Sequence, residues 1–254
     1  MSALALTTIL TPWYRRRAPR AGRSGSTGEP TGSTAPTPIL DHRSAPVRRL
    51  VDRATVAAAS SDALPVLEAA YAIIRDEIRA VYALDESTPA SRTLTRGFGS
   101  CSQRLAVLES AARALGIPTR VRALLIDRSF WYPRFPHLGF ALPGRVLLVW
   151  PEFEVEGAWR PASELFGPIG CQGGPGFANR GAETLFEAVG RCAVDWDGRH
   201  REGRDHDDAY DLSRFVRADL GRYRDRDEAF ARLGQTLCAP SRALADPIMR
   251  RVAA

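Results

Sequence analysis

Apolar side chains recur at helical spacing in two segments of the first half of the chain. Residues 64–81 carry them at positions 64, 67, 71, 74, 78 and 81, and residues 101–115 at positions 101, 105, 108, 112 and 115. Each series forms one stripe along an α-helix. Asp62 is a suitable N-cap for the first helix, and Gly116 predicts the end of the second.

The hydrophobic pattern then becomes typical of β-structure. Residues 121–126 (VRALLI) predict a strand, and the segments 137–142 and 145–150 flank a Pro-Gly pair, which predicts a hairpin. Residues 152–159 alternate apolar and acidic side chains, as a half-buried strand does. Helices followed by antiparallel strands predict an α+β fold.

The two ends of the chain have a different composition. Residues 15–48 are rich in Arg, Pro, Gly, Ser and Thr, so we expect disorder there. We therefore divide the chain into a basic tail, residues 1–49, and one domain, residues 50–254. Beyond the strands, the pattern predicts additional helices at 182–191, 211–233 and 239–252.

Charge and cysteine usage limit the partners and the compartment. The net charge is +6 and every basic residue is an arginine, but no aromatic stacking pattern or base-reading motif accompanies it, so a nucleic-acid partner is not expected. No apolar run is long enough to span a bilayer. The four cysteines match no zinc motif, and without a secretion signal we expect them to be reduced and the protein to be cytoplasmic.

One cysteine lies where a helix is predicted to start. Gly-Ser-Cys at 99–101, an Ala- and Leu-rich helix and the run ALGIPTR at 114–120 lead into a strand. The start of a helix lowers the pKa of a thiol, so Cys101 is a candidate nucleophile. The alternative is an inert core cysteine, since Cys101 also falls on the apolar stripe.

These residues resemble the transglutaminase-like superfamily over about residues 64–163. The resemblance implies a papain-like core, in which a nucleophilic cysteine at a helix start packs against a sheet that carries histidine and then aspartate. In the usual register, Trp150 and Trp159 match the tryptophans of the family motifs. The histidine position then holds Leu148 and the aspartate position holds Ser163, and neither can act as a base.

A second register keeps all three chemical roles. His137 would be the base for Cys101, and Glu152 would orient the imidazole, because a hairpin would bring the two side chains together. Glu154 and Asp127 are alternatives for the third role. This register is the preferred interpretation, and the catalytic prediction is therefore Cys101, His137 and Glu152.

The resemblance implies cysteine-dependent acyl transfer or hydrolysis of an amide, ester or thioester. The enzyme would be a peptidase, an amidase or an amide-forming enzyme of a natural-product pathway, acting on a peptide or a small acyl substrate. No metal and no organic cofactor follow from this chemistry. The alternative is a catalytically inactive transglutaminase-like scaffold that binds a peptide or protein partner, and a third reading is an adaptor that acts through its basic tail. The sequence leaves the oligomeric state open.

Overall fold

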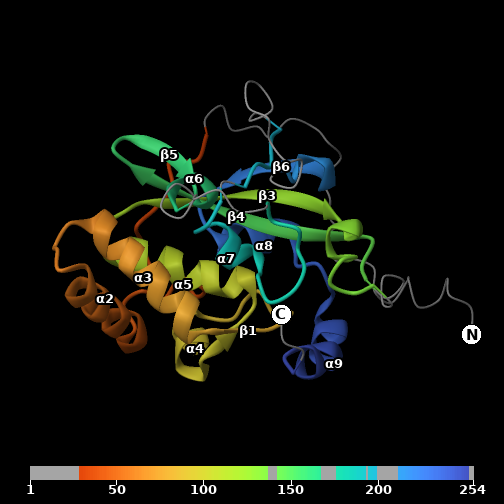
Figure 1. The fold of residues 1–254 in the computed structure, drawn as a ribbon, viewed down its shortest axis with the longest axis horizontal. Helices are drawn as coiled ribbons and strands as arrows, with labels where there is room; N and C mark the ends of the chain where they lie inside the picture. The colour runs from red at the N-terminus through yellow and green to blue at the C-terminus, as the bar shows by residue number, and fades with distance from the viewer. Residues whose placement is uncertain (1–28, 137–141, 167–175, 193, 199–210, 252–254) are drawn as a thin grey trace, which may run out of the picture.

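A helical layer forms the first half of the protein, and a four-stranded sheet lies over it (Figure 1). The structure is a computed structural model that describes residues 29–136, 142–166, 176–192, 194–198 and 211–251. The helical layer consists of α2 (Ala45–Ala58), α3 (Ala63–Glu77), α4 (Ala90–Arg96) and α5 (Cys101–Ala114). Both helices expected from the apolar stripes, α3 and α5, are present, so these predictions are confirmed.

Helix α5 lies at the centre of the domain. Ser100 caps its start, and its end is fixed by Gly116, which has a φ of 79°, and by a hydrogen bond of 2.9 Å from the Ile117 N–H to the Ala112 carbonyl. Every side chain from Gln103 to Arg113 is buried. A helix that is buried on all sides is a core element, so α5 positions whatever stands at its start.

The sheet is antiparallel and has the strand order β5-β4-β3-β6. Its strands are β3 (Thr119–Asp127), β4 (Arg145–Val155), β5 (Ala158–Pro161) and β6 (Val216–Tyr223). The strand segments expected at 145–150 and from residue 152 onward join into the single strand β4, and the chain turns at Gly157 into β5. The α+β prediction is confirmed.

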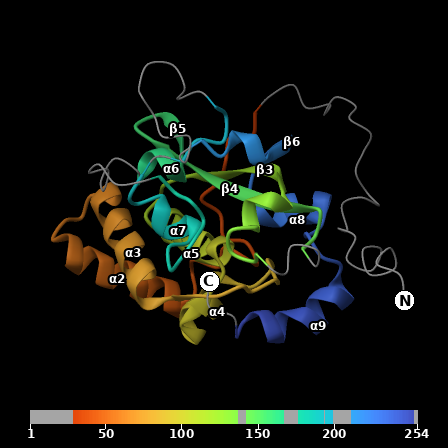
Figure 2. The same cartoon turned by 45° about the vertical axis from the view of Figure 1, so that its right-hand side comes forward.

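The last part of the chain differs most from the prediction. Residues 216–223 form β6 instead of a helix, because their side chains alternate between half-buried and exposed positions. The expected helix at 182–191 is the short α7 (Leu185–Ala188), whereas α9 (Ala239–Met249) is where it was predicted. Figure 2 shows α8 (Arg226–Leu233) beneath β3 and β6, with α9 below it. The remaining short elements are β1 (Arg79–Ala80), β2 (Phe98–Gly99), η2 (Arg128–Trp131), α6 (Ala162–Leu165) and η5 (Ser213–Phe215).

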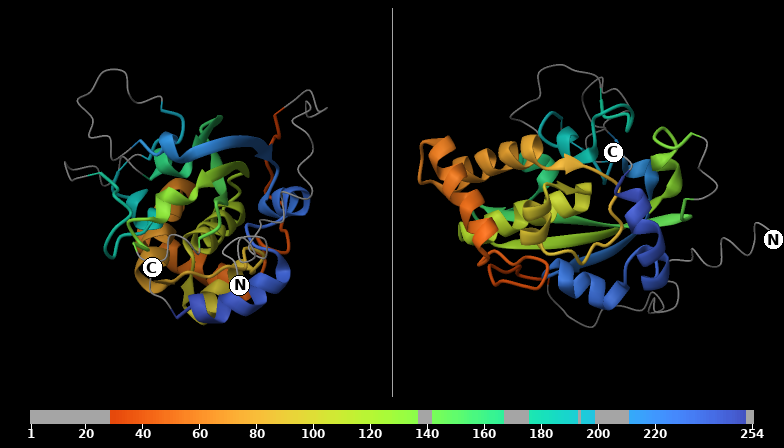
Figure 3. Two further views of the ribbon diagram at one scale, coloured as in Figure 1. Left: turned by 90° about the vertical axis from the view of Figure 1, so that its right-hand side faces the viewer. Right: turned by 90° about the horizontal axis from the view of Figure 1, so that it is seen from below.

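The two faces of the sheet belong to different clusters. On β3, Val121, Ala123 and Leu125 pack with Ala229 and Leu233 of α8. The alternate residues Leu124 and Ile126 belong to the main core, together with Trp150 of β4 and buried apolar side chains of α3 and α5. Seen from below, α5 lies against the sheet (Figure 3, right). Because the side-chain period of a strand is two residues, every even-numbered residue of β3 lies on the face that also carries Trp150.

The beginning of the described chain belongs to the folded unit. The boundary expected at residue 50 falls inside α2, and residues 29–44 lie against the domain, with Ser33 bridged to Thr119 at the start of β3. Within the described residues, no single helix has the length and hydropathy to cross a membrane. Helices α2 and α3 meet that test only when they are joined, across a bend of 109°.

Candidate functional site

Cys101 is the first residue of α5 and follows a complete capping box. The Gln103 N–H donates to Ser100 Oγ at 3.2 Å, and the Ser100 N–H donates to Gln103 Oε1 at 3.1 Å. Gln103 Nε2 donates in turn to the Asp85 carbonyl at 2.8 Å. Reciprocal bonds of this kind stabilise a helix start, so the sequence Gly-Ser-Cys-Ser-Gln fixes the position of Cys101.

The surroundings of Cys101 do not favour a thiolate. The residue is partly buried against the main core. Burial raises the pKa of the thiol to about 12, and the nearby guanidinium of Arg104 only partly opposes this effect. Arg104 is itself paired with Glu187 of α7, and its guanidinium carbon lies 4.2 Å from the Phe186 ring centroid. The expected lowering of the thiol pKa by the helix start is therefore outweighed by burial.

A group of buried polar side chains contacts α5. Arg226 of α8 donates from Nη1 to Ser102 Oγ at 2.9 Å and from Nε to Glu109 Oε1 at 2.5 Å. The Arg226 and Glu109 side chains are 1% and 0% exposed. Burial raises the pKa of Glu86, which hydrogen-bonds Ser102. These contacts fix the position of the helix start, and none of them involves a histidine.

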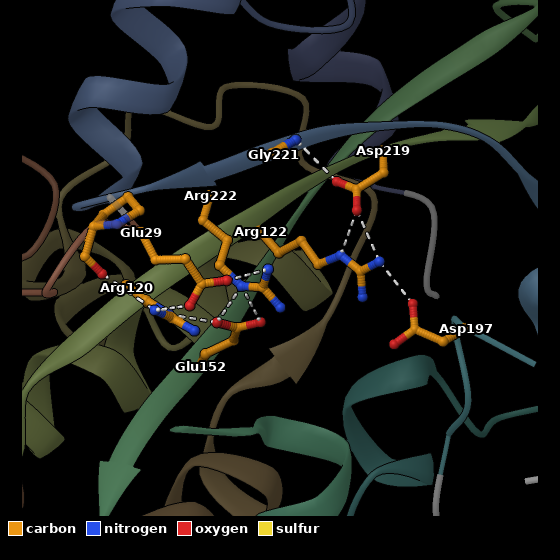
Figure 4. A network of polar contacts seen from close by, with 9 residues as sticks. Glu29, Arg120, Arg122, Glu152, Asp197, Asp219, Gly221 and Arg222 are labelled. Carbon is orange, nitrogen blue, oxygen red and sulfur yellow. Dashed lines mark hydrogen bonds and ion pairs between the residues drawn. The ribbon is translucent and has the colours of Figure 1, made fainter. Parts of the chain in front are cut away.

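Glu152 lies on β4 in the middle of a group of arginines (Figure 4). It is paired with Arg120 of β3, whose Nε donates to Glu152 Oε2 at 2.6 Å. Arg222 of β6 donates from Nε to both carboxylate oxygens, at 3.0 and 2.9 Å. The Glu152 side chain is 7% exposed, so this carboxylate is a buried counter-ion for two arginines.

Arg122 extends this network along β3. It donates to Asp219 Oδ2 at 2.8 Å and pairs with Asp197 Oδ1 at 2.6 Å. Hydrogen bonds to these two carboxylates raise the pKa of Arg122. We name Arg120, Arg122, Arg222 and Glu152 the arginine cluster. It borders a cavity of about 220 Å³. The other residues that line the cavity are Leu124, Trp150, Trp159, Pro161, Ser163, Glu164, Val194, Asp195, Trp196 and Asp197.

Of the four histidines in the sequence, the structure describes one. His137 lies outside the described residues, as do His200 and His206. His42 is described, but its Nε2 lies 3.0 Å from the Thr34 carbonyl oxygen. The neighbouring Ala35 carbonyl accepts a hydrogen bond from Arg113, near the end of α5 opposite Cys101. Within the described residues, Glu152 pairs with Arg120 and Arg222, and no hydrogen bond or ion pair joins it to Cys101; the triad of Cys101, His137 and Glu152 stays a prediction.

The two alternatives for the third role are placed elsewhere. Asp127 accepts a hydrogen bond from the Ser129 N–H and pairs with Arg217 at 2.9 Å, at the far end of β3. Glu154 lies near the other end of β4, paired with Trp159 of β5. As for metals, the described residues contain no group of His, Cys, Asp and Glu arranged to hold an ion.

Comparison with protein families agrees with this fold. Residues 51–163 match the family model of the transglutaminase-like superfamily. This part of the chain is similar to the transglutaminase-like superfamily. No curated protein and no solved structure matches the chain. The transglutaminase-like segment contains α3, α5, β3 and β4, which are the helix layer and the central strands described above.

The matched segment includes both positions of the usual register, and both are described. Leu148 is paired with Leu124 of β3 and packs, partly buried, against the main core. Ser163 lies in α6 at the edge of the cavity and is 2% exposed. A leucine has no proton acceptor and a serine carries no charge at neutral pH, so neither can replace an imidazole or a carboxylate.

The sequence analysis did not predict the arginine cluster, although two of its arginines form a recognisable pattern in the sequence of β3. Arg120 and Arg122 stand two residues apart in the strand TRVRALLID and therefore share one face. Two arginines on the same face of an otherwise apolar central strand require counter-charges, and Glu152 opposite Arg120 is one of them. Arg222 could not be found in this way, because its segment was expected to be helical.

Proposed function

We propose that this transglutaminase-like domain binds a peptide or protein partner and does not catalyse acyl transfer. The observation that carries the proposal is Leu148, which stands where the family's histidine would stand and packs against the core. Removing the general base from a cysteine site removes the means of forming the thiolate. The high pKa of the buried Cys101 thiol supports the same conclusion.

The binding surface in this proposal is the cavity beside the arginine cluster. Each of the three arginines keeps one terminal nitrogen that donates to no described residue: Arg120 Nη2, Arg122 Nη1 and Arg222 Nη2. Trp159 adds an aromatic face, with the guanidinium carbon of Arg120 4.3 Å from its ring centroid. Arginine and tryptophan are enriched among the residues that contribute most to protein interfaces.

The test compares ester hydrolysis in wild type and in the Cys101→Ala variant. We expect both proteins to hydrolyse p-nitrophenyl acetate at the same slow rate between pH 7 and 9, because Cys101 remains a thiol in this range. Cys238→Ala is the matched control, because it removes another partly exposed cysteine. A burst of p-nitrophenol that disappears only in Cys101→Ala would contradict the proposal.

A second candidate is the cysteine-dependent acyl transfer implied by the superfamily. One observation favours it. The Phe135 ring lies 4.8 Å from the Tyr82 ring, and Tyr82 is close enough to Cys101 for a thiolate there to raise the tyrosine pKa. His137 follows Phe135 by two residues in the sequence. In this candidate His137 takes the thiol proton and the Cys101 thiolate attacks the carbonyl carbon. The amine, alcohol or thiol of the substrate leaves with that proton, and an acyl-enzyme remains. Water or an amine then attacks the acyl-enzyme and releases the Cys101 thiol.

The same hydrolysis assay separates the two candidates when it includes a His137→Ala variant. Loss of a Cys101-dependent burst in His137→Ala would assign the base to His137 and favour the enzyme. Absence of any burst in wild type would favour the binding domain.

A further inference from the structure

The first described residues of the chain, Glu29 to Ala35, lie across the start of β3 like a bound peptide. Glu29 bridges two members of the arginine cluster: Arg120 Nη1 donates to its Oε2 at 3.1 Å and Arg222 Nη1 to its Oε1 at 2.9 Å (Figure 4). Arg120 Nη1 also donates to the Pro30 carbonyl at 3.2 Å. The Glu29 carboxylate and the Pro30 carbonyl are therefore the groups through which these two residues contact the arginine cluster.

The next residues complete a short extended contact. Gly32 has a φ of 71° and lies so close to the Trp159 ring that an added Cβ would stand 2.3 Å from a ring carbon. Ser33 and Thr119 exchange both backbone hydrogen bonds, at 3.0 and 3.1 Å, in an antiparallel bridge. We name residues 29–33 the N-terminal strap. It combines a carboxylate anchor, a glycine against an aromatic ring and a strand-like end, which are three means by which domains recognise peptides.

The carboxylate anchor of the strap is held weakly compared with the arginines beneath it. The Glu29 side chain is 63% exposed, whereas that of Arg120 is 4% exposed. Exposed ion pairs contribute little stability, and Glu152 keeps both arginines paired when Glu29 leaves. Displacement of Glu29 therefore exposes two oriented guanidinium groups beside the Trp159 ring. Both arginines remain paired with Glu152, so no buried charge loses its counter-ion.

We propose that Arg120, Arg222, Trp159 and the start of β3 form a docking site for an acidic, extended peptide segment of a partner, which the N-terminal strap occupies in cis. This inference rests on the proposed binding function and adds the chemistry of the partner. The partner supplies a carboxylate for the two arginines, a small residue against Trp159 and a backbone that pairs with Thr119. The strap competes with it.

The strength of this competition follows from the covalent connection. The strap continues directly into residues 34–44, which are held against the domain, so it stays at a high effective concentration beside the arginines and a partner peptide binds wild type only in competition with it. Displacing the strap by mutation removes that competition. Glu29→Gln weakens the anchor, and Gly32→Ala adds a Cβ for which the structure has no room.

The experiment is a calorimetric titration of the full chain with a capped synthetic peptide, TGEPTGSTA, which has the sequence of residues 27–35. We expect the double variant Glu29→Gln/Gly32→Ala to bind this peptide at least about tenfold more tightly than wild type, because the cis competitor is gone. On the same variant, the peptide TGQPTGSTA should bind at least about tenfold more weakly, because it lacks the carboxylate.

Two controls keep the result interpretable. Glu77→Gln/Gly144→Ala makes the same chemical changes away from the docking site: Glu77 is another exposed, ion-paired carboxylate, and no atom lies within 4 Å of a Cβ added at Gly144, so this variant should bind like wild type. If the strap variant loses its circular dichroism spectrum, the single variant Glu29→Gln, which leaves the backbone unchanged, replaces it with the same expected direction.

Three outcomes would overturn the proposal: equal affinity of the Glu and Gln peptides, equal affinity of wild type and a folded strap variant, or no binding to the folded variant at millimolar peptide. The titration does not depend on the thiol. A Cys101-dependent hydrolysis would therefore contradict the proposed function and leave this result standing, whereas any of the three outcomes would remove only the docking site.

Discussion

The start of α5 and the arginine cluster are two polar regions of the transglutaminase-like segment, and they differ in what surrounds their polar groups. At the helix start, the cysteine and its cap are retained, with the Ser100–Gln103 capping box intact. On the sheet, Leu148 and Ser163 stand at the base and acid positions of the usual register, and Glu152, the acid of the other register, is the counter-ion of Arg120 and Arg222. Retention of a nucleophile type therefore says little about activity unless its partners are retained as well.

The two regions also differ in how their charges are shielded. Under α5, Arg226 and Glu109 are almost completely buried and pair with each other. In the arginine cluster, Arg222 is 31% exposed and Glu29 is 63% exposed, so charge there remains accessible to a partner. A buried pair stabilises only as long as both members are present, whereas an exposed pair can exchange. We therefore expect the loss in free energy of unfolding to fall as the exposure of the disrupted ion pair rises.

The largest effect is expected under α5. Arg226→Ala should lower the free energy of unfolding by about 3–5 kcal/mol, because it leaves the buried Glu109 carboxylate without its counter-ion. Urea denaturation followed by circular dichroism measures this loss. The double variant Glu109→Gln/Arg226→Met removes both charges and should recover part of the stability. A loss below about 1 kcal/mol in Arg226→Ala would mean that water shields this pair like a surface pair.

An intermediate effect is expected in the arginine cluster. Glu152→Ala should lower the free energy of unfolding by about 2–3 kcal/mol, because Arg120 is nearly buried and loses its closest carboxylate. The effect is smaller than for Arg226 because Glu29 still pairs with both arginines. Denaturation in urea again gives the value. Combining Glu152→Ala with Glu29→Gln should cost more than the sum of the two single variants, and simple additivity would show that the carboxylates do not share the arginines.

The smallest effect is expected for the strap anchor. Glu29→Gln should change the free energy of unfolding by less than about 1 kcal/mol, since exposed ion pairs are screened by solvent. A larger loss would show that the strap is a structural part of the domain and would weaken the case for its exchange with a partner.

Most of the fold could be predicted because its signals are local. The apolar stripes of α3 and α5 and the stop at Gly116 fix the helix layer, and the apolar runs around β3 and β4 fix the central strands. Strand β6 was missed because its segment was assigned to one long helix over residues 211–233, although Val216, Ala218 and Leu220 alternate with exposed positions. Its place beside β3 depends on pairing across nearly a hundred residues, which no local pattern encodes.

The candidate site was less predictable than the fold. The position of Cys101 at a capped helix start followed from the sequence, but the pKa of its thiol depends on burial in the folded protein and on the charges of Glu187 and Glu86. Glu152 was expected to orient an imidazole, and its role as a counter-ion depends on Arg222 from a strand that was not recognised. Burial and long-range charge pairing are tertiary properties, so residue type and spacing alone could not supply them.

The pH dependence of Cys101 alkylation tests the central claim most directly. The folded protein is treated with iodoacetamide between pH 6 and 10, and modification of Cys101 and Cys238 is followed by peptide mass spectrometry. Hydrogen bonding to Ser241 lowers the pKa of Cys238, whereas burial raises that of Cys101 to about 12. Cys238 should therefore be labelled well before Cys101, which should stay unmodified through pH 10. Labelling of Cys101 near pH 7 that is faster than labelling of Cys238 would reveal a thiolate at the helix start and contradict the account.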